Sequence, residues 1–502
     1  MPGESVISLR AAVRGEVSTD PQTSGRVAQD ASHLTGRPLA VVVPSDTDDV
    51  VKLVRWARRS HVPLVARGGG TSLDGESVPP DGAVVVDFAP WNQLLEVDPD
   101  QLWARVQPGI VNRELHRQLL PHGVFFPPNP GSWTTSTIGG NVATNASGMR
   151  SFRYGPTRAW VREVTAVLGT GEKAHFGTRV AKRSVGPDLL QLFLGSEGTL
   201  GLATEVTVRL APLPPVRRGV VVPLPGSTTL GNVAARLAHL PSAGLSAVEY
   251  LDRGCAATIA ERRPVTWPRG DAALLLLEVE ADDAPEADCR LARLGTTLAR
   301  AGARTDGFTV FEDADELWTI RGMSGDVLNE RFGHHVREDV AVPLDRVDEL
   351  ATALATIARK EAVPYFLFGH LGEGSLHPNY AVDPATAKAE RIRGSVLRAA
   401  RTLGGTISAE HGVGRVKRPY LEEELGSEAV RVLAALKRAC DPDGILNPGD
   451  LYPPSPTAAA PSRSPSGRGA ERAAAGSPTV SPVRPSGRPS RSRPRRRRAV
   501  RP

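Results

Sequence analysis

The chain has 502 residues, of which 40% are hydrophobic and 23% are charged. This length and composition predict a globular protein with two or three domains. No apolar run approaches the roughly 18 residues that cross a bilayer. The first twenty residues lack the apolar core of a secretory signal, so we expect a cytoplasmic protein. The three cysteines, Cys255, Cys289 and Cys440, form no CxxC pair, which argues against a disulfide framework or a cysteine-ligated cluster.

The net charge of +6 comes from the end of the chain. Residues 453–502 hold twelve arginines, one acid and almost no large apolar residues, so they cannot bury enough surface to offset chain entropy. We expect this tail to be disordered. Its final arginines suit nucleic acid or anionic lipid, but a solvated tail with no dedicated partner is the favoured expectation.

Short strands and helices alternate along the first half of the chain. The apolar run at 38–44 predicts a strand, and the 3.6-residue apolar period of 47–62 predicts a helix. A strand and a glycine-rich loop follow at 63–75. Further strands are predicted at 83–88, 104–109, 161–168 and 204–210, and a further helix at 111–123. This mixture indicates an α+β domain.

Three prolines, Pro212, Pro214 and Pro215, mark a boundary after this domain. Two helix–strand alternations follow, at 232–249 and from 273 onward, and a helix is predicted at 428–439. We therefore expect a cofactor domain at 1–212, a substrate domain at 213–430, a segment at 431–452 that packs back on the first domain, and the tail at 453–502.

Two glycine-rich segments in the first half are candidates for a cofactor site. Gly68–Gly70 follow a strand, and three glycines can bring backbone N–H groups against a pyrophosphate because no Cβ blocks the approach. The loop is neither GxxxxGK[ST] nor GxGxxG, and a plain turn is the alternative. Residues 127–155 form a long, nearly uncharged loop that suits a planar ring, with Ser132, Thr137, Asn141 and Asn145 as hydrogen-bond partners.

A histidine pair in the second half is a candidate metal site. Residues 364–382 read as two strands around a tight GEGS turn. If Leu371 and Leu376 flank that turn, His370 and His377 are cross-strand neighbours with Cβ atoms about 5 Å apart. Glu410, in a second glycine-bordered segment, is a third potential ligand. Two imidazoles and a carboxylate leave open positions on a divalent ion, as catalysis requires, although a structural histidine pair is the alternative.

The glycine loop, the 127–155 segment and the glycine-rich turn at 195–210 together resemble the FAD domain of the vanillyl-alcohol oxidase/p-cresol methylhydroxylase family. The resemblance covers about residues 25–452 and is greatest to the D-lactate, glycolate and D-2-hydroxyglutarate dehydrogenase branch. It implies an α+β fold: a two-subdomain FAD-binding domain plus an α+β cap domain with an antiparallel sheet. FAD is expected to be non-covalent, because the loop lacks the histidine that often tethers the flavin. The expected FAD-binding residues are Arg67, Gly68, Gly69, Gly70, Thr71, Ser72, Leu73, Pro130, Gly131, Ser132, Thr137, Gly139, Gly140, Asn141, Asn145, Gly148, Gly198 and Leu202.

The same resemblance extends to the GHLGEGSLHPN and EHGVG segments. It implies that His370, His377 and Glu410 bind Zn²⁺ or a similar ion, and that Asn379 and His411 face the substrate. A metal-chelated 2-hydroxy acid has a lowered hydroxyl pKa. We expect His411 to remove that proton and hydride from C2 to pass to the flavin.

Two arginines complete the expected pocket. Arg321, on a predicted helix at 317–328, suits bidentate capture of a carboxylate, although a surface ion pair is the alternative. Arg337 replaces the lysine of similar proteins, which changes reach and geometry. Gly325 replaces a threonine one helical turn after the arginine. Both departures leave the identity of the substrate open.

The sequence therefore predicts an FAD-dependent, metal-assisted dehydrogenase that oxidises a small D-2-hydroxy acid to the 2-oxo acid. Electrons are expected to leave through a separate quinone, electron-transfer flavoprotein or iron–sulfur protein. One alternative is an FAD-dependent oxidase that uses O₂ on another alcohol, without a catalytic metal. Another is a nucleic-acid- or membrane-associated protein recruited through the arginine-rich tail.

Overall fold

The computed structural model describes residues 2–226, 229–240, 243–265, 272–303 and 308–452. The predicted disordered tail, 453–502, lies outside these residues. Within the described part of the chain, none of the helices is both long and apolar enough to span a bilayer.

The chain begins with a small mixed sheet. Strands β2 (Ala40–Val43), β4 (Val84–Asp87) and β3 (Leu64–Arg67) are parallel in that order, and β1 (Glu16–Ser18) runs antiparallel beside β2. The predicted helix is α3 (Thr47–Ser60), which begins where the Asp46 carboxylate accepts a hydrogen bond from the Asp49 N–H. The sequence did not predict α1 (Pro2–Ala12), β1 or α2 (Pro21–Val27).

A five-stranded antiparallel sheet follows. Its strand order is β5 (Leu94–Asp98), β6 (Trp103–Val106), β10 (Gly201–Arg209), β8 (Val161–Leu168) and β9 (Lys173–Gly177). Val106, Val164, Val206 and Val208 of this sheet are fully buried in one core, and Val167 and Leu202 are buried in another core that includes residues of α3. Strands β7 (Val124–Phe125) and β11 (Ala211–Pro212) form a separate pair.

The 127–155 segment is not one long loop, contrary to the sequence prediction. It contains α5 (Ile138–Thr144) and the single turn α6 (Ser151–Tyr154). Thr137 caps α5 by accepting a hydrogen bond from the Gly140 N–H, so its capping chemistry outweighs the two glycines that disfavour a helix. The other short elements of this half are α4 (Asn112–Leu119), η1 (Leu120–His122), η2 (Thr157–Ala159) and α7 (Leu189–Phe193).

The second half contains an eight-stranded antiparallel sheet. Its order is β15 (Thr309–Phe311), β12 (Val216–Leu224), β14 (Ala273–Ala281), β13 (Leu245–Leu251), β18 (Tyr365–Gly369), β19 (Ser375–Tyr380) and β16 (Val336–Arg337), with β17 (Val340–Ala341) also paired to β19. Its helices are α8 (Leu230–Ala238), α9 (Arg253–Arg262), α10 (Ala284–Arg300), α11 (Ala314–Gly322), α12 (Ser324–Phe332), η5 (Leu344–Arg346), α13 (Val347–Glu361), η6 (Leu371–Glu373) and α14 (Ala387–Thr402). The predicted α+β fold with an antiparallel sheet in this half is confirmed.

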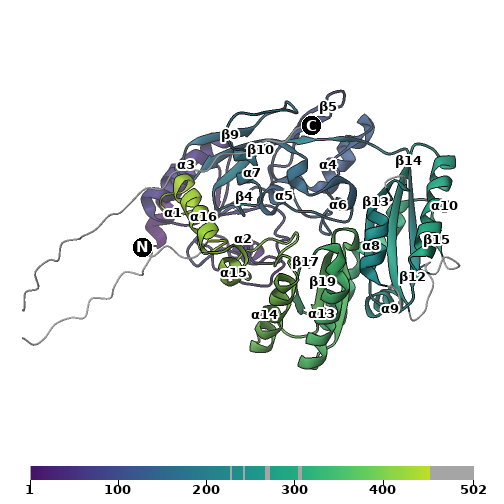
Figure 1. Cartoon of the computed structure of the whole chain (residues 1–502). Coiled ribbons are helices and arrows are strands. Elements are labelled where there is room, and N and C mark those ends of the chain that lie inside the picture. Colours follow the sequence, from purple (N-terminus) through teal and green to yellow (C-terminus); the bar gives the residue numbers. More distant parts are fainter. Residues whose placement is uncertain (1, 227–228, 241–242, 266–271, 304–307, 453–502) are drawn as a thin grey trace, which may run out of the picture. The chain divides into compact units, whose positions relative to one another are not determined.

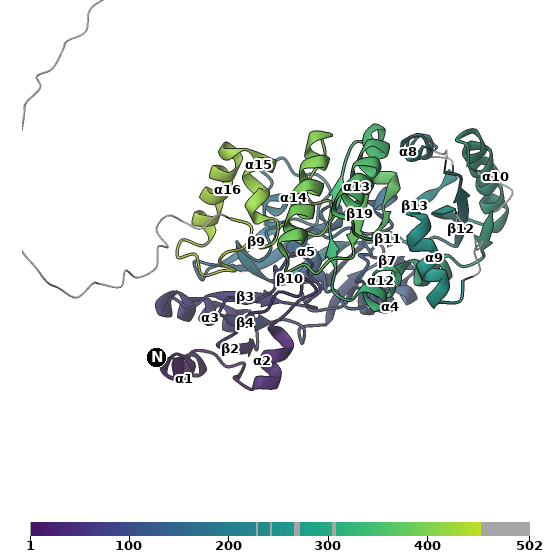
Figure 2. The ribbon, with the colours of Figure 1, turned by 90° about the horizontal axis from the view of Figure 1, so that it is seen from below.

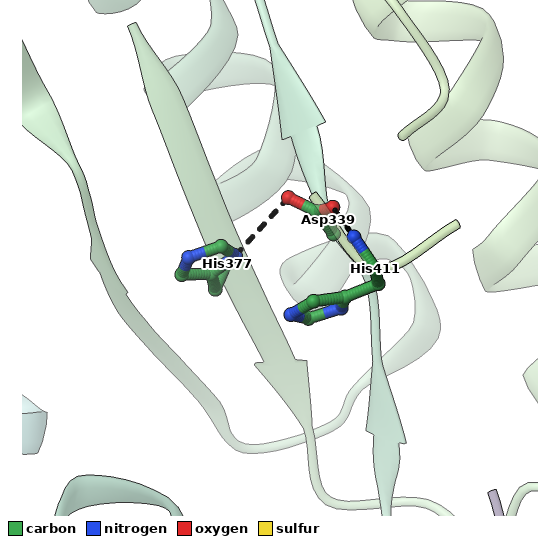
Figure 3. Close-up of side chains that lie close together, drawn as sticks. All are labelled: Asp339, His377 and His411. Atoms are coloured by element: carbon green, nitrogen blue, oxygen red, sulfur yellow. Dashed lines mark hydrogen bonds and ion pairs between the residues drawn. The ribbon is translucent and has the colours of Figure 1, made fainter. Parts of the chain in front are cut away.

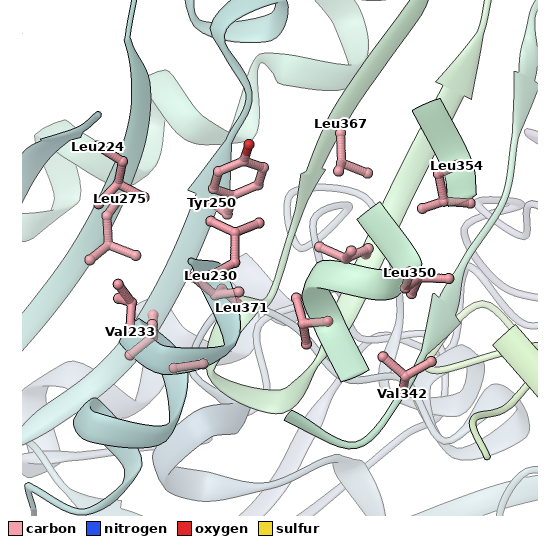
Figure 4. Packing of buried hydrophobic residues seen from close by; sticks show 14 of the residues in the cluster. Leu224, Leu230, Val233, Tyr250, Leu275, Val342, Leu350, Leu354, Leu367 and Leu371 are labelled. Atoms are coloured by element: carbon pink, nitrogen blue, oxygen red, sulfur yellow. The ribbon is translucent and has the colours of Figure 1, made fainter. Parts of the chain in front are cut away.

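Helices α8 and α13 bury the main core of this sheet. Figures 1 and 2 show α10 beside β12, and α13 beside β19. In Figure 4, leucines and valines of α8 and α13 face side chains of the strands. Val233, Leu350 and Leu354 are completely buried, and full burial of one such side chain stabilises the fold by about 2 kcal/mol.

The end of the described chain lies against the first half. η7 (Arg418–Tyr420), α15 (Leu421–Leu425) and α16 (Ser427–Cys440) precede it. The Leu64 N–H donates to the Ile445 carbonyl at 2.8 Å, and the Asn447 N–H donates to the Leu64 carbonyl at 2.8 Å. Residues 445–447 thereby extend the backbone hydrogen bonding of β3, the strand that leads into the glycine loop.

A buried ion-pair network joins the α6 segment to the large sheet. Glu278 on β14 is fully buried and lies 2.7 Å from Arg217 and 3.4 Å from Arg150, the residue before α6. Burial would raise the pKa of Glu278, but the charges of Arg150 and Arg217 lower it to about 2. Nearby, the Tyr154 hydroxyl donates to Glu280 at 2.7 Å.

We expect Glu278→Gln to lower the free energy of unfolding by about 3 kcal/mol at pH 7, because two arginines lose a buried counter-charge. The pKa of Glu278 in the folded protein is below its ordinary value of 4.5. The stabilisation is therefore complete above about pH 4.5 and is lost as the pH falls towards 2. Denaturant unfolding followed by tryptophan fluorescence at several pH values measures both effects.

Glu312→Gln is the matched control, because the Glu312 side chain is 80% exposed in its pair with Arg218. Exposed pairs contribute little, so this variant should unfold like the wild type. Equal losses of unfolding free energy in the two variants would contradict a stabilising role for the buried Glu278 ion pairs. A loss in Glu278→Gln that does not depend on pH would contradict it as well.

Candidate active site

The glycine loop after β3 packs backbone against backbone. A Cβ on Gly68 would lie 2.2 Å from Thr137 Oγ1, and one on Gly69 would lie 2.3 Å from the Thr135 carbonyl oxygen. Gly70 has φ +66°, which glycine adopts without strain. Contact with residues 135–137 therefore requires glycine at positions 68 and 69, and the backbone angle favours glycine at position 70. Both requirements hold whether or not a ligand is bound.

Residues 135–137 are themselves fixed by the helices on either side. The Asn112 N–H donates to the Ser136 carbonyl, and the side-chain amides of Asn112 and Asn141 donate to each other at 3.3 and 2.8 Å. Both asparagines are buried. The start of α5 is thus held rigidly opposite the glycine loop.

Three cavities follow one another along this contact. The first has a mostly small, apolar lining that includes Ala66, Pro108 and Ala143. The second is lined by the glycine loop from Gly68 to Ser72. The third is much the largest of the three, at about 560 Å³, and extends from Gly70 to the histidines of the large sheet. Gly140 lines all three, so the cavities adjoin one another there.

Most of the residues predicted to bind FAD line these cavities. They are Arg67, Gly68, Gly69, Gly70, Thr71, Ser72, Leu73, Pro130, Gly131, Ser132, Thr137, Gly139, Gly140, Asn141 and Gly198. Three are not among the lining residues: Asn145 ends α5 and accepts a hydrogen bond from the Arg158 N–H, Gly148 packs on the Asn129 carbonyl, and Leu202 is in the core. The apolar first cavity, the glycine-lined second and the open third fit an extended dinucleotide such as FAD.

The predicted cross-strand pairing of His370 with His377 is wrong. His377 on β19 pairs with Phe368, and His370 lies just beyond the end of β18. The reason is the connection: Leu371–Glu373 form the 3-10 turn η6, which takes up more residues than a tight turn. The two rings nevertheless meet, with centroids 5.0 Å apart.

His370, His377 and Glu410 converge in the third cavity. Glu410 Oε1 lies 3.0 Å from His370 Nε2 and 3.4 Å from His377 Nε2. The opposite ring nitrogens also face carboxylates, with His370 Nδ1 2.6 Å from Glu249 and His377 Nδ1 3.3 Å from Asp339. Inner nitrogens that converge and outer nitrogens held by carboxylates are the arrangement of metal-binding histidines.

Asp339, His377 and His411 form a second close group (Figure 3). The rings of His377 and His411 stack at 5.2 Å. However, Asp339 Oδ2 already accepts backbone hydrogen bonds from Ala409, Glu410 and His411, at 2.9, 2.7 and 2.8 Å. Asp339 therefore shapes the loop that carries Glu410, and the first group is the better candidate for a metal.

The buried groups of this site shift one another's pKa values. Burial would raise the pKa of Glu410, but the charge of His370 and its hydrogen bond lower it to about 2, so Glu410 is ionised at neutral pH. The charges of Glu249 and Glu410 in turn raise the pKa of His370 well above its ordinary 6.5. Burial lowers the pKa of His411 below its ordinary 6.5, which leaves a neutral imidazole facing the cavity at pH 7.

The two predicted arginines both line the third cavity but differ in their partners. Arg321, at the end of α11, lies 2.7 Å from Glu249, which also holds His370. Arg337 contacts Asn329 and lies 3.3 Å from His335 Nε2, and no carboxylate of the described residues is within ion-pair distance of it. Gly325 is not on the same helix as Arg321, because Met323 separates α11 from α12.

Asn379 also lines this cavity, with its side chain held by two neighbours. Its Oδ1 lies 3.1 Å from His335 Nε2, and its amide donates a hydrogen bond to the His377 carbonyl at 2.8 Å. Glu249 and Asp339 were not predicted from the sequence as site residues. Glu249 is the one acid in the wholly buried strand β13, and an acid in a buried strand is a signal that could have identified it.

Family models and similar proteins match most of the chain. The family described as FAD linked oxidases, C-terminal domain, matches residues 213–451, and an FAD binding domain matches residues 38–177. Glycolate oxidase subunit GlcD of Bacillus subtilis (strain 168) is 34% identical over 460 residues, which cover 88% of this chain and 95% of that protein. D-lactate dehydrogenase of Archaeoglobus fulgidus is 32% identical over 438 residues, covering 86% of this chain and 94% of that protein.

Solved structures show the same fold at lower identity. 4-Ethylphenol oxidase from Gulosibacter chungangensis superposes with a TM-score of 0.74 at 19% identity, over 90% of this chain and 97% of that one. p-Cresol methylhydroxylase superposes with a TM-score of 0.75 at 16% identity, over 89% and 96%. The chain belongs to the FAD-linked oxidases, in the branch that contains the glycolate, D-lactate and D-2-hydroxyglutarate dehydrogenases.

Proposed function

We propose that this oxidoreductase converts a small D-2-hydroxy acid to the 2-oxo acid, with FAD as the oxidant and a divalent metal at His370, His377 and Glu410. One observation carries the proposal. The cavity that contains these three side chains adjoins the glycine-lined cavity and shares Gly70, Thr71 and Ser72 with it. The names of the relatives support a hydroxy-acid substrate.

When bound, the ion supplies a Lewis acid that favours ionisation of the substrate hydroxyl, and FAD supplies the hydride acceptor. His411 has a lowered pKa and is neutral at pH 7, so it can accept the hydroxyl proton. Arg321 and Arg337 bind the substrate carboxylate, and Asn379 lies beside them. Glu249 and Asp339 orient the imidazoles of His370 and His377.

Electrons are proposed to leave through a separate acceptor of the quinone, electron-transfer-flavoprotein or iron–sulfur type. The chain's three cysteines, Cys255, Cys289 and Cys440, are all free, and none is proposed to carry electrons. The metal-independent oxidase is the weaker candidate, because structural histidines do not require converging Nε2 atoms with a carboxylate on each outer nitrogen.

The purified full chain should be yellow, and anaerobic addition of D-lactate, D-2-hydroxyglutarate or glycolate should bleach its flavin absorbance. Treatment with EDTA should suppress the bleaching, because the substrate loses its Lewis acid. If no D- or L-2-hydroxy acid reduces the bound flavin, the proposal is wrong.

Glu410→Gln should reduce the metal content from about one ion per chain to almost none, because the site loses its carboxylate ligand. Elemental analysis of the FAD-loaded protein measures this. Glu373→Gln is the control: Glu373 is an acid three residues from His370 that accepts a hydrogen bond from the Ser151 hydroxyl and is not one of the proposed ligands. A full complement of metal in Glu410→Gln would rule out this ligand set.

His411→Asn should slow flavin reduction by about 100-fold or more, because the proton acceptor is lost. Flavin and metal contents should be unchanged, since neither depends on the imidazole. Stopped-flow reduction at saturating substrate isolates this step, and a wild-type rate would assign the base elsewhere.

A further inference from the structure

Glu197 is a strained residue in the loop between α7 and β10. Its φ is +54°, although it is not glycine, and only 4% of it is exposed. Such backbone angles are uncommon for residues with a Cβ and persist only where the surroundings impose them. Glu197 therefore has a specific structural role in this loop.

The Glu197 carboxylate forms hydrogen bonds with the loop that carries Glu410 and His411. Its two oxygens accept hydrogen bonds from the N–H groups of Val413, at 2.7 Å, and Gly414, at 3.0 Å. A Cβ on Gly412 would lie 2.9 Å from Glu197 Oε1 and 2.5 Å from Glu76 Oε1. The loop thus has little space to shift without losing these contacts.

Glu197 also borders the cofactor side of the molecule. Glu197 and Gly198 line the second cavity together with the glycine loop. The Asn447 amide donates to the carbonyls of Glu197, at 2.9 Å, and Glu76, at 2.8 Å. A ligand that fills this cavity therefore restricts the same residue that holds the 410–414 loop.

We propose that Glu197 is a positioning residue that couples the flavin cavity to the metal site. An occupied flavin cavity fixes Glu197, and Glu197 fixes the loop that presents Glu410. The inference rests on the proposed metal and flavin sites. Thermodynamic linkage makes the effect reciprocal, so the metal must strengthen FAD binding by the same factor as FAD strengthens metal binding.

The carboxylate is essential to this role because both of its oxygens act as acceptors. In Glu197→Gln one oxygen becomes an NH₂ group, which would face a backbone N–H and could not accept from it. Glu280→Gln is the matched control. Glu280 is equally buried and also joins the two halves, through Tyr154, but it does not touch the 410–414 loop.

The test measures the dissociation constant of FAD from the full-length holoprotein, by the flavin fluorescence that appears at equilibrium after serial dilution. Each protein is first stripped of metal with EDTA and then compared with and without added Zn²⁺, whose binding is measured on the same samples. In the wild type and Glu280→Gln, Zn²⁺ should lower this dissociation constant by about 10-fold or more. In Glu197→Gln the ratio of the two dissociation constants should fall to below about 2-fold.

Zn²⁺ that binds to the wild type without changing the dissociation constant of FAD would overturn the coupling and leave the metal site intact. Failure of Zn²⁺ to bind would remove the metal site and the coupling together. Undiminished coupling in Glu197→Gln would overturn the role of this residue. Should that variant not fold, Glu197→Asp, which keeps the charge but shortens its reach, must also show a reduced ratio.

Discussion

The candidate site depends on one buried carboxylate, that of Glu410, and on the groups that make its charge tolerable. A buried anion is costly unless opposite charge or hydrogen bonds compensate it. Two imidazoles supply that compensation, and each is in turn held by a further carboxylate, Glu249 or Asp339. The sheet order β13-β18-β19-β16 brings these groups together from distant parts of the sequence. The antiparallel sheet is therefore the frame that makes this charge arrangement possible.

On the cofactor side, close steric contacts rather than charges determine the shape of the cavities. Gly68 and Gly69 touch residues 135–137 so closely that any side chain would displace them. This contact places the end of β3 against the start of α5 and leaves adjoining cavities between them. Small residues thus determine the shape of the flavin half, while charged residues determine the substrate half.

Features encoded within short segments of the sequence were predicted, whereas contacts between distant segments were not. Strands such as β8 (Val161–Leu168) were predicted to the residue because a short segment rich in β-branched residues is a local signal. The histidine and glutamate ligand set could likewise be proposed from short motifs. The strand register at His377 was missed because it depends on a 3-10 turn, and Glu249 was missed because its partner His370 lies 121 residues away. Side-chain partners at such separations follow only from the folded sheet.

The two arginines of the cleft are not equivalent, and the difference bears on anion binding. Glu249 balances the charge of Arg321 and fixes its position with the same carboxylate that orients His370, so Arg321 is pre-organised. Burial lowers the pKa of Arg337, which has only the more distant charge of Asp326 to oppose this. An anionic group that binds beside Arg337 would therefore relieve an electrostatic cost already present in the protein. Since Gly325 leaves open space next to that guanidinium, Arg337 is the arginine of the pair whose charge remains open to an anionic ligand.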